Sequence, residues 1–166
     1  MTRRPRVSWR PASTHLRRRG SALLESILIL TPTLAMMLGI LDFSMVLFLR
    51  GTFQHACREG VRYAVTYQVL PGLGHDASIR TVVQRHAMGF LNGPAGADRI
   101  RIRYFAPDTL QEVGMNAPGN LVEVSIEGFQ WGWILPLLRS AAPLTLTARA
   151  TDRMESLPGG MAPPHR

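Results

Sequence analysis

The sequence predicts an α+β protein in which one long N-terminal helix crosses a membrane with its first half and then enters a small outer domain. Three observations support this. Residues 21–49 contain only two ionisable side chains, Glu25 and Asp42. A helical spacing of apolar residues continues to residue 68, and three stretches of alternating apolar and polar residues follow. The outer domain should therefore hold a second helix and a three- to four-stranded antiparallel sheet.

Composition limits the class of protein before any motif is considered. The chain has 166 residues, 19 basic side chains that are all arginine, 11 carboxylates and a net charge of +8. Seven of the arginines lie in residues 1–20, which contain no acid, so the rest of the chain is nearly neutral. A nucleic-acid-binding domain needs its cations on the folded surface, so this distribution argues against a nucleic-acid partner. The single cysteine, Cys57, excludes an intrachain disulfide and a cysteine-based zinc cluster.

Residues 1–20 are predicted to be a basic cytoplasmic leader and residues 21–49 a transmembrane helix. About 20 apolar residues cross ~30 Å of hydrocarbon. A buried core helix is disfavoured, because a chain this short has no large core that hides a helix apolar on all sides. A cleaved secretory signal peptide is the stronger rival, but its apolar part should have about 7–15 residues, and this one is longer. The arginine excess before the span keeps the N-terminus in the cytoplasm.

The helix is expected to continue outside the membrane over residues 50–68, where apolar residues recur every three or four positions. A proline and two glycines that follow should end it. A second helix is expected over residues 76–91. Asp76 is its predicted N-cap, and an Asn-Gly-Pro turn at residues 92–94 its predicted end.

The alternating stretches predict strands with one buried and one wet face, so the sheet should lie on the two helices. Residues 129–138, with Trp131 and Trp133, are apolar but too short and too broken by glycine and proline to span a membrane. They should form a loop that packs on the protein or touches the membrane. The outer α+β domain is predicted at residues 69–158, with a disordered tail at residues 159–166. The predicted strands are residues 99–105, 121–127 and 144–150, with a turn at 117–120.

The start of the apolar segment has a distinctive order: arginines, Gly20, and an apolar helix whose fifth residue is Glu25. This order resembles the precursors of type IV pilins, and the resemblance implies that a prepilin peptidase cuts between Gly20 and Ser21. A glycine does not obstruct the extended conformation that a protease cleft requires. Cleavage frees the amino group of Ser21, which can pair with Glu25 of a neighbouring copy, because a carboxylate in lipid is costly without a partner. Alternatively, Glu25 lies near the interface and reaches water.

A longer ordered set of residues follows the same start. It consists of Gly20, Glu25, Pro32, Gly39, Asp42, Phe43, Ala56, Arg58, Glu59, Gly60, Arg62, Tyr63 and Ala64. This set resembles the TadE-like family, pseudopilins of the tight-adherence (Flp, type IVb) pilus machinery.

The TadE-like resemblance implies a pilin-like fold and a protein that crosses the bacterial inner membrane once, with its C-terminal domain in the periplasm. The implied function is pilus assembly. The implied partners are the membrane, prepilin peptidase, other pilins or pseudopilins and the assembly platform. Three roles stay open: filament subunit, tip component or membrane-retained assembly factor.

Several residues of this set have structural interpretations of their own. Pro32 lies in mid-helix, where it either kinks the helix for packing or is a tolerated bend. Asp42 lies ~26 Å along the helix from Glu25, hence near the far interface, where we expect it to be hydrated or paired with Arg50 or a partner's cation. Gly60 weakens the helix by up to about 1 kcal/mol, which indicates close approach by another element. The sheet of the same chain is favoured over a neighbouring helix.

The outer part of the helix carries polar and reactive groups. Glu59 and Arg62 are spaced for a contact worth only a few tenths of a kcal/mol. Tyr63 and Tyr67 are expected to pack against the sheet. Cys57 lies on the apolar stripe and is expected to be buried, the alternative being a disulfide between two chains.

No pattern in the sequence indicates catalysis. The five histidines show no HExxH motif, no glycine-rich phosphate loop precedes a lysine, and no nucleophile elbow is present. We therefore predict no enzyme, no metal and no cofactor. The alternative function is a signal-anchored periplasmic domain that binds a ligand or scaffolds a complex and is not part of a pilus.

Overall fold

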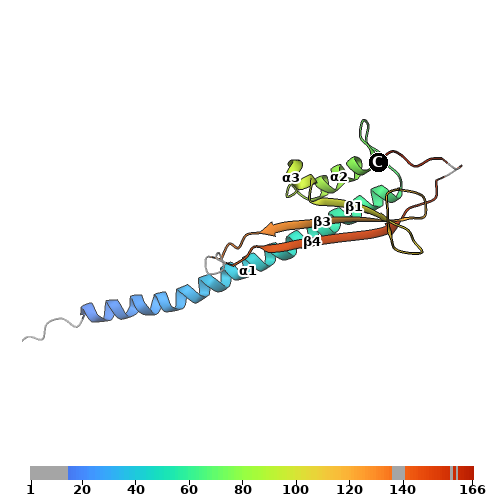
Figure 1. Cartoon of the computed structure of the whole chain (residues 1–166). Helices are drawn as coiled ribbons and strands as arrows, with labels where there is room; N and C mark the ends of the chain where they lie inside the picture. Colours follow the sequence, from blue (N-terminus) through green and yellow to red (C-terminus); the bar gives the residue numbers. More distant parts are fainter. Residues whose placement is uncertain (1–14, 136–140, 158, 160) are drawn as a thin grey trace, which may run out of the picture. The chain divides into compact units, whose positions relative to one another are not determined.

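The computed structural model describes residues 15–135, 141–157, 159 and 161–166. Most of the predicted leader lies outside them. The chain divides into two compact units, residues 1–40 and 41–166. The elements in the described residues are α1 (His15–Val65), α2 (His75–His86), α3 (Gly93–Ala97), β1 (Ile100–Phe105), β2 (Glu112–Val113), β3 (Leu121–Trp131) and β4 (Leu144–Arg153) (Figure 1). A long N-terminal apolar helix followed by a small domain with an antiparallel sheet confirms the predicted α+β class.

The described part of the first unit, residues 15–40, is entirely helical and belongs to α1. The helix begins at His15, six residues before the predicted start, because the leucine and arginines ahead of Gly20 are good helix formers. From Ser21 onward, α1 is long and apolar enough to cross a membrane. The hydroxyls of Ser26 and Thr33 donate to backbone carbonyls one turn earlier, Ser26 to Ala22 at 2.8 Å and Thr33 to Ile29 at 2.7 Å, which suits a segment that lies in a membrane.

The second unit contains one four-stranded antiparallel sheet in the order β2-β1-β3-β4. Three strands match the predicted ones, but β3 runs on to Trp131 and β4 to Arg153. Strand β3 continues past a β-bulge between Ile126 and Phe129, where Gly128 has a φ of 69°. The sequence prediction missed the two-residue strand β2, which has too few residues for an alternating pattern.

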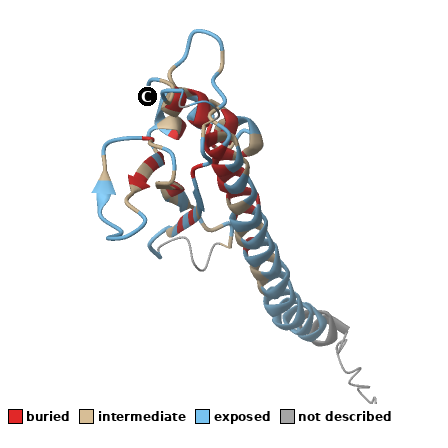
Figure 2. Cartoon of the chain, turned by 90° about the vertical axis from the view of Figure 1, so that its right-hand side faces the viewer, coloured by how far each residue is buried: buried red, intermediate tan, exposed pale blue. Residues whose placement is uncertain are grey.

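One hydrophobic core joins the second half of α1 to α2 and the sheet. Figure 2 shows the buried positions along one side of these elements. Phe53 of α1 is completely buried, and its ring meets Phe129 of β3 at 4.8 Å between centroids. The core begins within α1 at Leu49, and the second unit, residues 41–166, includes this part of α1 together with the outer domain predicted at residues 69–158. Hydropathy alone does not separate a lipid-facing stretch from the core-facing stretch that follows it.

The helix boundaries differ from the predicted ones at three places. α1 ends at Val65 instead of residue 68, and Tyr67 just beyond it has a φ of 53°. The N-cap of α2 is Gly74, because the Asp76 carboxylate is bonded instead to the Tyr104 hydroxyl at 2.8 Å. α2 ends at His86, five residues before the predicted end at residue 91, and residues 92–94 open α3 instead, with a proline in its first turn.

The last residues of the predicted disordered tail are instead bound within the second unit. The His75 amide donates to the His165 carbonyl at 2.7 Å, and the Arg166 guanidinium pairs with Asp76 at 2.9 Å. The same guanidinium lies over the Tyr104 ring, 4.8 Å from its centroid. A proline- and glycine-rich composition does not reveal such an ion pair, because its partner lies some 90 residues away in the sequence.

Candidate functional site

The predicted functional residues are distributed along α1 and do not meet in one cleft. Five lie in the first unit and seven in the second. Those of the first unit are Gly20, Ser21, Glu25, Pro32 and Gly39. Those of the second are Asp42, Phe43, Arg58, Glu59, Gly60, Arg62 and Tyr63.

The apolar surface of the first unit is open to its surroundings. Glu25 is exposed within it, and Leu28, one turn later, has 76% of its surface exposed. Pro32 lies inside the helix and lacks the N–H that otherwise bonds the Leu28 carbonyl. A Cβ atom added to Gly39 would meet nothing within 4 Å. The packing of the single chain therefore explains neither the proline nor this glycine.

Asp42 is the most constrained of the predicted residues. The residue is 2% exposed, and its carboxylate accepts hydrogen bonds from the Ile134 amide at 2.9 Å, the Leu135 amide at 2.8 Å and the Trp131 indole at 3.4 Å. This differs from the expected hydration or pairing with Arg50. The reason is that β3 ends beside this turn of α1 and presents free backbone amides, which are good partners for a carboxylate.

The loop that binds Asp42 is a site that the sequence prediction did not connect with it. Residues 129–131 of the predicted loop belong to β3, and residues 132–135 hold the two amides that bind Asp42. Residues 136–138 lie outside the described residues. Because some 90 residues separate the partners, no local pattern reveals the contact.

Gly60 is buried because two elements approach it. A Cβ atom there would lie 2.5 Å from Val83 Cγ2 of α2 and 3.3 Å from Val124 Cγ1 of β3. Close approach was correctly predicted, but the nearest neighbour is a helix of the same chain and not the favoured sheet. Both neighbours are side chains, so Gly60 makes room for the core where α1, α2 and β3 meet.

Four of the remaining predicted residues of the second unit line two shallow depressions beside α1, whereas Phe43 is exposed and lines neither. Arg58 is exposed, and Arg62 lines both depressions. One depression, of about 350 Å³, is lined by Arg58, Val61, Arg62, Val65, Thr66, Ala150, Thr151, Asp152 and Glu155. The other, of about 380 Å³, is lined by Glu59, Arg62, Tyr63, Thr66, Gln68, Val82 and His86.

The contacts expected for the residues around these depressions are formed only in part. Within the described part of the chain, no ion pair joins Glu59 to Arg62, so the expected contact is not formed. Tyr63 and Tyr67 are half-buried and pack against the core, and the Tyr67 ring stacks on that of His75. No group of three His, Cys, Asp or Glu side chains placed to hold a metal ion occurs among the described residues.

Cys57 is completely buried and its thiol points to the Ala148 carbonyl of β4, 3.7 Å away. Burial raises the pKa of the thiol to about 12. A neutral, enclosed thiol is unreactive. The expected burial is therefore observed, and the alternative of a link between two chains does not fit this position.

The architecture defines a class: a protein with one N-terminal apolar helix suited to single-pass membrane anchoring and a small α+β domain after it. Residues 20–62 match the model of the family described as TadE-like protein, which confirms the resemblance stated above. The match covers about a quarter of the chain. No curated protein and no solved structure matches the chain. The TadE-like segment and the apolar helix fit a pilus-associated, membrane-anchored protein of a structural family.

Proposed function

We propose that this protein is a pseudopilin or minor pilin that takes part in assembling a tight-adherence (Flp-type) pilus. The observation that carries the proposal is the TadE-like segment, which begins at Gly20, directly before the apolar part of α1. The protein crosses the bacterial inner membrane once, with its N-terminus in the cytoplasm and its α+β domain in the periplasm. Its partners are prepilin peptidase, other pilins or pseudopilins and the assembly platform.

Processing after Gly20 is the first step of the proposed function. Gly20 lies within α1 in this structure, so the peptidase must unwind the helix locally. A glycine helps, because it favours the helix by about 1 kcal/mol less than alanine does. Cleavage removes residues 1–20 with their seven arginines and leaves Ser21 with a free ammonium group.

The second step is pairing between copies. Glu25 is exposed on an apolar helix, and in lipid its carboxylate needs a cation. The ammonium of Ser21 on a neighbouring chain supplies one when two helices pack at the correct axial offset. The open surface at Gly39 supports close helix packing, because a glycine lets a second backbone approach. Assembly thus proceeds by helix packing and charge pairing, without catalysis.

N-terminal sequencing of the protein extracted from membranes tests the processing step. In cells that contain prepilin peptidase, the mature chain should begin at Ser21. The Gly20→Ala variant should remain uncut, whereas the control Ser21→Ala should be cut and begin with alanine. A full-length N-terminus in the unmodified protein would contradict the proposal and favour the signal-anchored periplasmic domain that binds a ligand or scaffolds a complex.

The Glu25→Gln variant tests the pairing step. It should insert into membranes and be processed normally, but pilus assembly should fall strongly, because the neutral amide no longer attracts the neighbouring ammonium. Ser26→Ala is the matched control, since it changes the next residue and keeps the carboxylate. Normal piliation by Glu25→Gln, measured by electron microscopy, would rule out charge pairing while leaving the processing step standing.

A further inference from the structure

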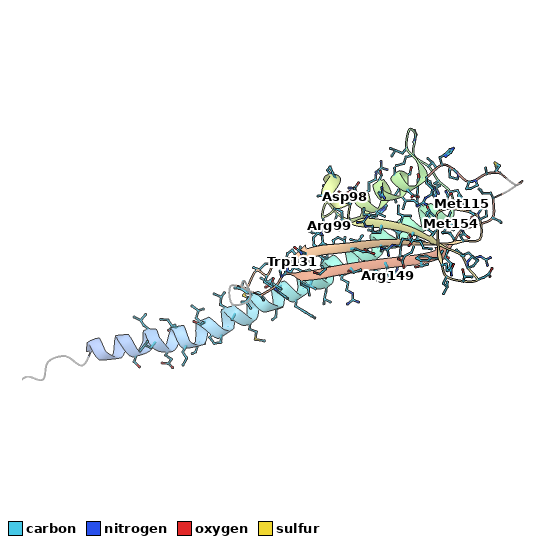
Figure 3. The ribbon with its side chains drawn as sticks, in the orientation of Figure 1. Asp98, Arg99, Met115, Trp131, Arg149 and Met154 are labelled. Carbon is cyan, nitrogen blue, oxygen red and sulfur yellow. The ribbon has the colours of Figure 1, made fainter. Side chains whose placement is uncertain are left out.

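The end of the sheet that lies beside residue 42 carries exposed apolar side chains. Ile134 is 50% exposed, and Trp133 is partly exposed with its indole N–H bonded to the Ala142 carbonyl. Nearby on α1, three further apolar side chains are exposed although they belong to the second unit: Phe43, Leu47 and Phe48. Figure 3 shows Trp131 at this end of β3 and Met115 at the opposite end of the sheet.

The position of Asp42 along the chain determines where the loop at residues 131–135 lies relative to the bilayer. A span that begins at Ser21 needs about 20 residues to cross the hydrocarbon, so it ends near residue 40. Asp42 follows two residues later, and its carboxylate holds the backbone of Ile134 and Leu135 at less than 3 Å. The loop is therefore tied to the point at which the helix leaves the hydrocarbon.

The composition of the loop suits the boundary between hydrocarbon and water. Tryptophan has an apolar body and one N–H group, and it is enriched at this boundary in membrane proteins. The carboxylate of Asp42 is tolerated there, because three donors of the loop satisfy it. Arg50, exposed two turns further along α1, can reach lipid headgroups.

We infer that residues 131–135 form a second membrane contact, in which Trp133 and Ile134 enter the interfacial region of the bilayer and the outer domain rests on the lipid surface. Asp42 positions this loop. The inference rests on membrane anchoring by residues 21–40 and not on processing or pilus assembly. The partner is the bilayer itself, through its headgroup region.

Fluorescence quenching of a single tryptophan tests the inference in the full chain reconstituted into phosphatidylcholine–phosphatidylglycerol vesicles. Trp133 is left as the only tryptophan in the variant Trp9→Phe/Trp131→Phe. Lipids brominated near the headgroup should quench most of its emission, and aqueous acrylamide should quench little. The matched control replaces all three tryptophans by phenylalanine and adds Met115→Trp, at an exposed site at the other end of the sheet.

The control tryptophan should respond in the opposite way, with strong quenching by acrylamide and none by brominated lipid. Acrylamide quenching of Trp133 equal to that of the control would overturn the inference, whether or not the chain is processed after Gly20. Asp42→Ala in the Trp133 variant should lower the quenching by brominated lipid at least twofold. Unchanged quenching there would overturn the positioning role of Asp42.

Discussion

The two parts of α1 carry similar apolar side chains, but only the second part buries them within this chain. Up to residue 40 these side chains are exposed in the single chain, as at Leu28, Leu30 and Met36. From Leu49 onward one face of the helix is buried against the sheet and α2. The same contrast holds for two glycines: Gly60 is enclosed by side chains, and Gly39 has open space around it.

This difference separates two groups of residues: those whose identity is explained by packing within this chain, and those whose identity is not. Phe53, Cys57 and Gly60 lie within the TadE-like segment and are accounted for by packing within this chain. Glu25 and Gly39 lie in the same segment without such an account. The family match therefore covers two groups of residues: those that pack within this chain, and those that its packing does not explain. The proposed contacts with the membrane and with other pilins concern only the second group.

Removing a core side chain of α1 should have the largest effect. Phe53→Ala should lower the free energy of unfolding of the outer domain by about 3–5 kcal/mol, because the buried ring leaves a cavity beside Phe129. Leu30→Ala, on the exposed part, should change it by less than about 0.5 kcal/mol. Denaturant unfolding of the detergent-solubilised protein measures both. Equal effects of the two variants would contradict the division of the helix.

The two glycines should respond oppositely to the same change. Gly60→Ala should destabilise the outer domain by about 1–3 kcal/mol, because its new methyl group overlaps Val83. Gly39→Ala should leave unfolding unchanged or slightly favour the helix, while reducing copurification with other pilins if helices pack there. Thermal unfolding and affinity copurification measure the pair. A stable Gly60→Ala protein would show that α2 can move away from α1.

A pH effect should be smaller and confined to the outer domain. His75 is completely buried, and among the described residues neither ring nitrogen has a hydrogen-bond partner. Burial lowers its pKa from the usual 6.5. The unfolded chain therefore binds a proton more readily, and stability should be full above pH 6.5 and fall as the pH drops below it.

Variants at two histidines isolate this effect. His75→Phe keeps an aromatic ring against Tyr67 and should remove most of the loss of stability between neutral and mildly acidic pH. His55→Gln, at an exposed position, should retain the loss. Urea unfolding across this pH range measures it, and a His75→Phe protein with an undiminished pH dependence would assign the effect to other groups.

Local patterns predicted the elements of this fold better than its long-range contacts. The long helix, the second helix and three strands follow from apolar periodicity, and the close approach at Gly60 follows from its cost to a helix. The loop amides that bind Asp42 and the Arg166 guanidinium that binds Asp76 lie some 90 residues away in the sequence. The Tyr104 hydroxyl lies 28 residues from Asp76, so no local pattern encodes these contacts. Hydropathy also does not show that residues 41–68 belong to the second compact unit, because a core-facing stripe continues the apolar run without a break.

The most direct test of this account is cysteine scanning along α1 of the protein in membrane vesicles, in a Cys57→Ala background. A membrane-impermeant maleimide should label no position in residues 25–40, because lipid surrounds that stretch. In residues 50–62 it should label the exposed positions Arg50, His55, Arg58 and Arg62 but not the core positions Phe53 and Gly60. Labelling on every side of the helix, either in residues 25–40 or in residues 50–62, would contradict this account. It would show that the first part of α1 does not lie in the membrane, or that the second part does not pack against the outer domain.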